Sequence, residues 1–372
     1  MPFGFCDVRI FVVLLLIIND MKSLIFLVFL SMSAAVKAQN LALADSIVKY
    51  QMESGGWPKN QDWLRGADVA YMEECRRTGV GSTIDNGATI RELRTLAEVL
   101  AAGVEESRAV RYRAAFDRGV RYLLVMQYAN GGWPQFWPSR SDDSYSNHVT
   151  FNDNAMINVM RLLRDVADGR GVMGRIPVEE TTRTACRTAF WRGVRCILDC
   201  QIPDRKGRPT VWCQQHDAHT LRPASARKYE LAAYCGHGET VDIVLLLMDV
   251  VDDAPDYRSP LLKQLGISRK LLRRRIAFAV DWLKGHAIHD MKLEAFTNVE
   301  GQPDHRLVHE AGAPDLWARY YDLETELPLY SDRHGLPLRS FNEIGYERRN
   351  GYSWVGYSPQ RLFAKYLVWK NR

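Results

Sequence analysis

An internal repeat constrains the fold of this chain more than any other feature of its sequence. Phe116 leads to Gln127 through a Gly-Val pair, and Phe190 leads to Gln201 in the same way, with both landmarks displaced by 74 residues. A single displacement for both landmarks indicates a duplicated segment. A fainter copy of the same helix occurs at Ala279–Leu283.

A Gly-Gly-Trp-Pro turn accompanies the repeat. Gln51 precedes Gly55–Pro58 by the same interval with which Gln127 precedes Gly131–Pro134. The glycines give backbone freedom, the proline a fixed φ, and the tryptophan a broad aromatic face. The two tryptophans could fill the interior or stack on a sugar ring. We favour the interior, because burial is the commoner use of a large aromatic side chain.

An amphipathic helix is predicted after each turn. Apolar residues recur at intervals of three and four over Asn86–Leu100, Asn154–Val166 and Glu239–Val251. Helices joined by Gly-rich turns, at roughly 75 residues per unit, favour stacked hairpins with a shared core. Strand signals are few. We therefore predict an all-α fold, an α/α toroid of repeated helical hairpins over residues 39–372 as one catalytic domain, with irregular loops forming a groove at one mouth.

A leader is predicted before position 39. Met21-Lys22 is followed by the apolar run Leu24–Leu30 and a small-residue site that ends at Ala38, which is typical of a secretory signal. An earlier apolar run, like this one, is shorter than the ~20 residues of a spanning helix. We predict that residues 1–38 are a leader, with the true start at Met21 and the signal at 21–38. The mature protein is then secreted or periplasmic without stable membrane association; an uncleaved anchor is the alternative.

Composition narrows the function classes. The chain has 47% hydrophobic residues and a net charge of +5, which is an ordinary globular composition with a mild basic excess. No Lys/Arg run or RNA-binding aromatic motif accompanies that excess, so nucleic acid is not an expected partner. The seven cysteines include no Cys-x-x-Cys pair, which argues against a zinc site. Nothing indicates an oligomer, and we expect a monomer.

Acidic residues open the predicted helices. Asp85 and Asp153 each adjoin an asparagine at what looks like the same place in two repeats, and Glu239 opens the third helix. They could be N-caps, because an Asp oxygen accepts hydrogen bonds from first-turn amides. Carboxylates at one rim could equally bind calcium, or act as the acid and base of a glycoside hydrolase. Their repeated placement favours a function beyond capping.

A basic pair, Arg227 and Lys228, lies in a loop that is dense in polar residues. Such a pair is usually a solvated surface. In a cleft it would bind carboxylates, with the arginine acting as a two-pronged fork.

Seven short motifs occur in order along the chain. They are Gly55–Asn60, Thr83–Thr89, Phe151–Met156, Thr210–Cys213, Ala226–Glu230, Trp317–Leu323 and Glu347–Tyr352. In this order they resemble the successive blocks of the family ten pectate lyases, over nearly the whole mature chain. No single block is decisive, but the ordered set is highly specific.

The resemblance implies a pectate lyase that cleaves α-1,4-polygalacturonate. It implies calcium-assisted β-elimination, which gives 4,5-unsaturated oligogalacturonides. By the same resemblance, Asp85 and Asp153 match the calcium-associated aspartates, and Arg227 matches the arginine that the family assigns as the base for the C5 proton. The residues that match substrate-binding positions are Asn86, Arg319 and Arg333.

Two features of the implied site are unusual. Arginine normally stays protonated, which conflicts with a role for Arg227 as a base. The block around Arg333 has His334 where the family pattern has an aspartate, so the local subsite departs from that pattern.

Two other function classes remain open. A glycoside hydrolase would use Asp85 with Asp153 or Glu239 as a carboxylate pair, would stay active in chelator and would form no unsaturated product. A pectin-binding protein without activity would need a broken site, whereas Asp85, Asp153 and Arg227 are all present.

Overall fold

The computed structural model describes residues 38–253 and 255–372. Apart from Ala38, the predicted leader lies outside the described residues. Within the described ranges, no helix is both long and apolar enough to cross a membrane. The assignment of residues 39–372 to one domain stays a prediction.

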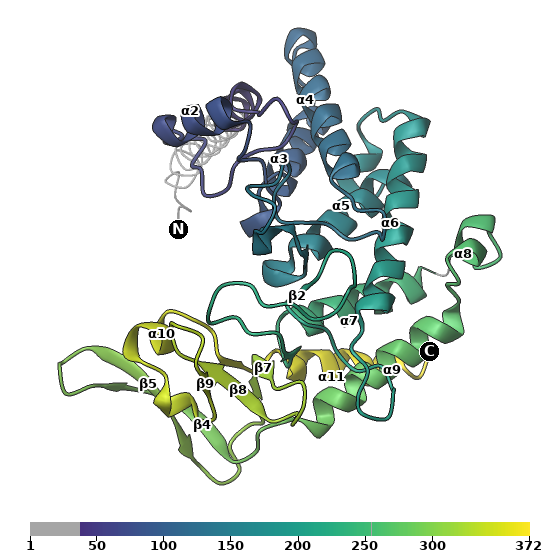
Figure 1. Cartoon of the computed structure of the whole chain (residues 1–372). Coiled ribbons are helices and arrows are strands. Elements are labelled where there is room, and N and C mark those ends of the chain that lie inside the picture. Colours follow the sequence, from purple (N-terminus) through teal and green to yellow (C-terminus); the bar gives the residue numbers. More distant parts are fainter. Residues whose placement is uncertain (1–37, 254) are drawn as a thin grey trace, which may run out of the picture.

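Three helical hairpins contain most of the helical residues of the described ranges (Figure 1). The packed pairs are α3 (Ile90–Ala101) with α4 (Glu106–Val125), α5 (Ala155–Asp168) with α6 (Glu180–Cys200), and α7 (Glu239–Asp252) with α9 (Arg269–Gly285). The predicted helices after the three turns are thus confirmed. The remaining helical segments are residues 38–49, α2 (Val69–Thr78), α8 (Pro260–Gln264), α10 (Tyr346–Asn350) and α11 (Ser358–Trp369).

The first helices of the hairpins pack side by side. Helix α3 contacts α5, α5 contacts α7, and α7 contacts α11. In Figure 1, α3 and α4 lie at one end of this row, and α9 and α11 lie at the other. The helical repeats therefore form a row rather than the predicted toroid.

The all-α prediction was wrong, because antiparallel sheets make up a substantial part of the fold. The sheets pair β1 (Val149–Thr150) with β2 (Gln215–His216), β4 (Met291–Thr297) with β5 (Pro303–His309), and β6 (Trp317–Ala318) with β10 (Val355–Gly356). A fourth sheet has the order β3 (Tyr234–Cys235), β7 (Tyr320–Tyr321), β8 (Pro328–Ser331) and β9 (Pro337–Leu338). Most of these strands are too short to show a period of two, so the sequence carries little sign of them.

One strand signal was readable. In β4, apolar residues Met291, Leu293 and Ala295 alternate with polar residues Lys292 and Glu294. This alternation is typical of a strand with one apolar and one polar face. The β4–β5 hairpin projects from the lower part of the molecule in Figure 1, away from α3 and α4.

One hydrogen bond recurs in four turns. An indole Nε1 donates to a main-chain carbonyl near the end of the preceding helix: Trp57 to Ile47 at 2.7 Å, Trp133 to Leu123 at 2.8 Å, Trp212 to Ile197 at 2.7 Å, and Trp317 to Leu283 at 2.7 Å. All four tryptophans are buried, which confirms the interior role favoured for the first two. The fourth turn was faint in the sequence because the β4–β5 segment is inserted between its helix and its tryptophan.

A glutamine connects each of the first three turns to the next hairpin. Its Nε2 donates to two carbonyls, one in its own turn and one in the following long helix: Gln51 to Gly55 and Ala115, Gln127 to Gly131 and Ala189, and Gln201 to Thr210 and Arg275. These bonds set the spacing between neighbouring repeats.

We expect the close contact between Gly193 and Trp133 to limit substitution. A Cβ at Gly193 would lie 2.9 Å from Cζ3 of Trp133 and 3.0 Å from Sδ of Met160. Overpacking of this kind costs about 1–3 kcal/mol, against a gain of up to ~1 kcal/mol from replacing glycine by alanine in a helix. Gly193→Ala should therefore lower the free energy of unfolding, measured by denaturant titration.

Gly285→Ala is the matched control, because Gly285 also lies in a helix and a Cβ there would meet no atom within 4 Å. This variant should be as stable as the parent or slightly more stable. Equal stability of the two variants would contradict the packing argument.

Candidate functional site

A polar pocket of about 110 Å³ lies where the turns of the first three repeats meet. Its lining residues come from segments far apart in the sequence: Lys59, Asp85, Asn86, Gln135, Tyr145, Asn152, Asp153, Gln214, Gln215, Arg227 and Glu230. The turns of the first three repeats thus meet at one pocket, although the predicted toroid is not formed. Four of the predicted site residues, Asp85, Asn86, Asp153 and Arg227, are in this list.

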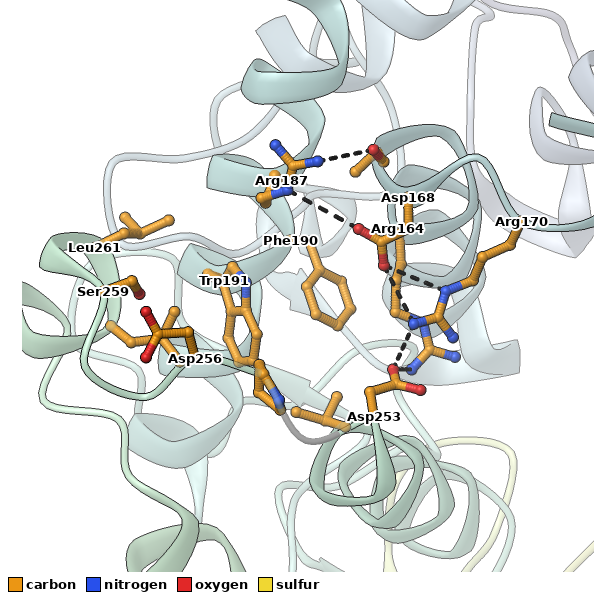
Figure 2. A pocket seen from close by; sticks show the side chains of 14 residues that line it. Arg164, Asp168, Arg170, Arg187, Phe190, Trp191, Asp253, Asp256, Ser259 and Leu261 are labelled. Carbon is orange, nitrogen blue, oxygen red and sulfur yellow. Dashed lines mark hydrogen bonds and ion pairs between the residues drawn. The ribbon is translucent and has the colours of Figure 1, made fainter. Parts of the chain in front are cut away.

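Another pocket, between α5, α6, α7 and α8, is a weaker candidate for the catalytic site than the polar pocket (Figure 2). Its arginines pair with aspartates of the same pocket: Arg164 and Arg170 with Asp253, and Arg170 and Arg187 with Asp168. The charges of this pocket are thus largely satisfied internally, and we place the candidate site in the polar pocket.

Main-chain hydrogen bonds align the repeats residue by residue. The amides of Thr83, Thr150 and Cys235 donate to the carbonyls of Trp57, Trp133 and Trp212, and the amides of Ile84, Phe151 and Gly236 donate to the carbonyls of Gln135, Gln214 and Arg319. The position two residues after each buried tryptophan is therefore equivalent in all four turns. It carries Lys59, Gln135, Gln214 and Arg319, of which the first three line the pocket.

This alignment corrects the predicted match between Asp85 and Asp153. Because Thr83 is equivalent to Thr150, Asp85 is equivalent to Asn152, and Asp153 is equivalent to Asn86. The first repeat thus presents Asp-Asn and the second presents Asn-Asp. The two carboxylates come from adjacent positions of the repeat rather than from the same position.

The capping interpretation of the two aspartates was also wrong. They lie in the short 3-10 turns η1 (Asp85–Gly87) and η3 (Asn152–Asn154), and the residues before α3 and α5 are Thr89 and Asn154. Positive φ values of 51° at Asn86 and 52° at Asp153 turn the chain at these points, a conformation that Asn and Asp tolerate better than most residues. The two turns contact each other, which brings their polar side chains to one pocket.

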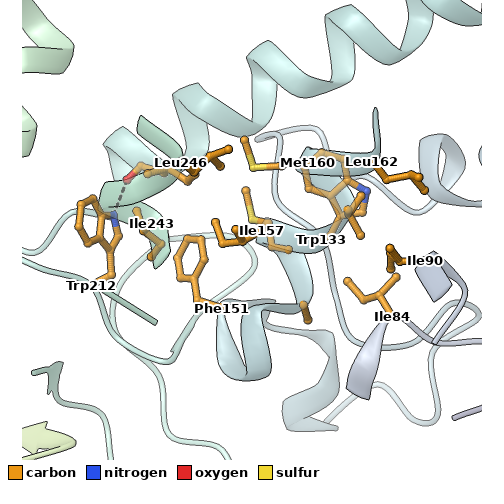
Figure 3. Close-up of a cluster of buried hydrophobic side chains, with 14 of the residues drawn as sticks. Ile84, Ile90, Trp133, Phe151, Ile157, Met160, Leu162, Trp212, Ile243 and Leu246 are labelled. Carbon is orange, nitrogen blue, oxygen red and sulfur yellow. Dashed lines mark hydrogen bonds between the residues drawn. The ribbon is translucent and has the colours of Figure 1, made fainter. Parts of the chain in front are cut away.

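Buried apolar side chains anchor these turns to the hydrophobic core. Ile84 and Phe151, which directly precede Asp85 and Asn152, are fully buried. Figure 3 shows them in one apolar cluster with Trp133, Ile157 and Trp212. The side chains that precede the polar residues are therefore fixed in the core.

Asp85 is buried beside a lysine. Its Oδ2 lies 2.5 Å from Nζ of Lys59, its Oδ1 accepts the amide of Asn86 at 3.1 Å, and its side chain is only 8% exposed. Lys59 therefore supplies the positive charge that compensates this carboxylate.

Asp153 lies at the mouth of the pocket and has no such partner among the described residues. It accepts a hydrogen bond from Nδ2 of Asn152 at 2.8 Å. The surrounding protein reduces its hydration and so raises the pKa of Asp153, the nearby charge of Asp85 raises it further, and Arg319 and Arg227 oppose both effects. The carboxylate is thus in a site where an added positive charge would be favourable.

Arg227 is held by a buried glutamate. Its Nε donates to Oε2 of Glu230 at 2.8 Å, its Nη2 donates to Oε1 at 2.5 Å, and its backbone amide also bonds to Oε2. Glu230 in turn accepts hydrogen bonds from Gln214 and from the hydroxyl of Tyr352. The hydrogen bonds with Glu230 raise the pKa of Arg227 above its usual value, against the effect of desolvation.

The two remaining predicted arginines lie outside the pocket lining. Arg319 is 11% exposed, pairs with Glu239 at 2.5 Å and donates to Oδ1 of Asn152 at 3.2 Å, so it lies directly behind the pocket. Arg333 is 66% exposed and pairs with Glu347 at 2.8 Å. Its loop adjoins the Arg227 loop.

Several residues of the site were not singled out from the sequence. Lys59, Gln135 and Gln214 could have been found by aligning the positions after the repeated tryptophans. Gln215 and Glu230 had no such signal, because their roles depend on contacts between distant segments. Oε1 of Gln215 is buried and accepts no hydrogen bond from the described residues.

Comparison with known proteins finds one matching family and similar solved structures. Residues 51–363 match the family described as pectic acid lyase. Two solved structures of family 10 polysaccharide lyase from Cellvibrio cellulosa are similar. One is a mutant in complex with trigalacturonic acid, with 30% identity, 87% of this chain and 92% of that chain covered, and a TM-score of 0.69. The other has 29% identity, with 88% of this chain and 92% of that chain covered, and a TM-score of 0.71. Among curated proteins nothing matches.

We expect Arg319→Met to be strongly destabilising. It would leave Glu239 buried without its partner, and breaking a buried pair in this way costs about 3–5 kcal/mol. Burial already raises the pKa of Glu239. Protonation at low pH would therefore relieve part of the penalty, and the loss in free energy of unfolding should grow as the pH rises.

Arg333→Met is the control for this measurement. Because its side chain is largely exposed, the free energy of unfolding should change by no more than about 0.5 kcal/mol. Denaturant titration of both variants at acidic and neutral pH checks the two expectations, and a loss for Arg319→Met as small as that of the control would contradict a structural role for its ion pair.

Proposed function

The chain belongs to the pectic acid lyase family and is a pectate lyase, and we propose that its polar pocket cleaves polygalacturonate by calcium-assisted β-elimination. One observation carries the proposal: Asp85, Asp153 and Arg227, from three distant segments, line the same pocket. The similar Cellvibrio cellulosa enzyme that was solved with trigalacturonic acid supports the choice of substrate. Basic side chains around the pocket would attract an acidic polymer.

The oxygen donors of the pocket fit calcium, although they do not complete its coordination. Among residues 38–253 and 255–372, no group of three or more His, Cys, Asp or Glu side chains could hold a metal. Asp85 and Asp153 provide two carboxylates, and Gln215 provides a buried amide oxygen to which none of the described residues donates a hydrogen bond. Calcium prefers six to eight oxygen ligands. We infer that Asp85 and Asp153 would hold the ion together with substrate and water oxygens.

The proposed reaction removes a proton next to a carboxylate. Bound calcium would neutralise that carboxylate and so make the C5 proton of the uronate more acidic. We assign removal of this proton to Arg227. The electron pair of the C5–H bond then forms the C4–C5 double bond, the C4–O bond breaks, and the departing oxygen takes a proton from solvent. One product carries the unsaturated uronate.

The ion pair with Glu230 opposes a basic role for Arg227. A guanidinium must lose a proton before it can accept one, and Glu230 favours the charged form. A role as base therefore requires that substrate binding weakens this pair. If the pair persists, Arg227 stays charged and holds a substrate carboxylate instead.

Other side chains would bind the polymer. We assign Asn86 to contacts within the pocket, and Arg333 to a substrate carboxylate at the outer edge, where its exposed side chain can reach solvent. Arg319 would act through Asn152, to which it donates a hydrogen bond. A monomeric state and export from the cytoplasm remain predictions.

The family match favours the lyase over the glycoside hydrolase, and the surroundings of Glu239 agree with it. Glu239 is 4% exposed and paired with Arg319, so it is not available as the second member of a carboxylate pair. The reaction products distinguish the two activities directly.

The reaction product tests directly whether the protein cleaves by elimination. With polygalacturonate and calcium, the protein should produce the ultraviolet absorbance of an unsaturated uronide, and chelator should abolish the increase. Arg227→Ala should lower the rate by about 10²–10⁴-fold, the usual contribution of a proton-transfer group. Arg222→Ala is the control, since this exposed arginine of the same loop lies outside the pocket lining. New reducing ends without the absorbance would contradict elimination.

Glu230→Gln tests whether Arg227 acts as the base. This variant removes the charge that raises the pKa of Arg227, so that pKa falls and the uncharged fraction at a given pH increases. If Arg227 is the base, the alkaline rise of the pH–rate profile moves to lower pH, even though weaker positioning lowers the maximal rate. An unshifted profile with a raised KM would mean that Arg227 only holds substrate.

A further inference from the structure

Lys59 has no role in the reaction described above, yet it contacts one of the two proposed calcium ligands. We propose that Lys59 is a built-in counter-ion of Asp85 that makes calcium binding depend on substrate, because its ammonium group occupies Asp85 until a substrate carboxylate draws it away. The inference rests on the proposed function and assigns a further residue to the same pocket.

Both oxygens of Asp85 accept hydrogen bonds from the protein. Oδ2 bonds to Nζ of Lys59 at 2.5 Å, and Oδ1 accepts the amide of Asn86. The carboxylate is buried, so solvent screens the two charges weakly. A divalent cation that approaches Oδ2 must displace the ammonium group or stay close to it, and the repulsion between the two cations weakens binding.

The scaffold directs Lys59 into the pocket. It occupies the position two residues after a buried tryptophan, which in the next two repeats carries Gln135 and Gln214, and all three side chains line the same pocket. Trp57 is fixed by its indole bond to Ile47 and by its amide bond to Oγ1 of Thr89 at 3.0 Å. The equivalent residues in those two repeats are uncharged, so the first repeat contributes a cation where they contribute amides.

Lys59 can leave Asp85 without unfolding the site. Its side chain is 28% exposed, which places it at the solvent side of the pocket. A lysine ammonium group sits on a flexible stem and donates in several directions. A uronate carboxylate entering the pocket offers it a second partner and frees Oδ2. A methyl-esterified uronate carries no charge and would not do so, which links calcium binding to unesterified substrate.

The test measures calcium binding rather than activity. Calcium is titrated calorimetrically into the full protein, with and without saturating trigalacturonate, in an Arg227→Ala background that slows turnover of the ligand. Lys59→Met removes the charge and keeps the length of the side chain, and Lys59→Arg keeps the charge. Lys206→Met is the control, because Lys206 is exposed and outside the pocket lining. The free energy of unfolding of each variant confirms that it is folded.

In the background protein, trigalacturonate should strengthen calcium binding by about 10-fold or more, within the usual range of coupling between two ligands. Lys59→Met should bind calcium alone about 10-fold more tightly and lose most of the effect of trigalacturonate, whereas Lys59→Arg and Lys206→Met should retain that effect. Equal affinity and equal coupling in Lys59→Met would overturn the role of Lys59 and leave the proposed function intact. If no variant binds calcium even with trigalacturonate, the calcium-dependent function fails, and the inference fails with it.

Discussion

The hydrogen bond from a buried indole to the end of the preceding helix is the interaction on which the site depends. A buried N–H without a partner costs about 1–3 kcal/mol, so each tryptophan is held in one place and one orientation. Four turns share this bond, in Trp57, Trp133, Trp212 and Trp317. The residue two positions later is directed to the pocket in the first three turns. In the fourth, Arg319 lies directly behind it.

Charge compensation distinguishes the acidic residues of the site. Asp85 is paired with Lys59, Glu230 with Arg227, and Glu239 with Arg319. Burying a carboxylate is costly without such a partner. Asp153 is the exception in this group, since within the described ranges its hydrogen-bond partner is the neutral amide of Asn152 rather than a cation. The pocket therefore combines compensated carboxylates with one that favours an additional cation, which agrees with the proposal that calcium binds there together with an acidic polymer.

Differences between the turns of the repeat explain how the molecule departs from a helical ring. The first two turns are short, but the fourth is interrupted by the β4–β5 hairpin before Trp317 completes it. Short strands such as β3 and β7 then join segments that are far apart in the chain. The loops that carry Arg227 and Arg333 meet beside these strands. Arg227 thereby reaches the pocket formed by the turns of the first three repeats.

The sequence alone determined the three helices that follow the turns, the buried tryptophans, the family resemblance, and four residues that meet in the pocket. These features follow from local periodicity and from ordered motifs, which spacing along the chain records. Only the tertiary structure decided the one-residue shift between Asp85 and Asp153, the pairing of Glu230 with Arg227, the burial of Arg319 and the sheets. Each of these depends on which distant segments lie within hydrogen-bond distance of each other, and helical periodicity carries no information about that.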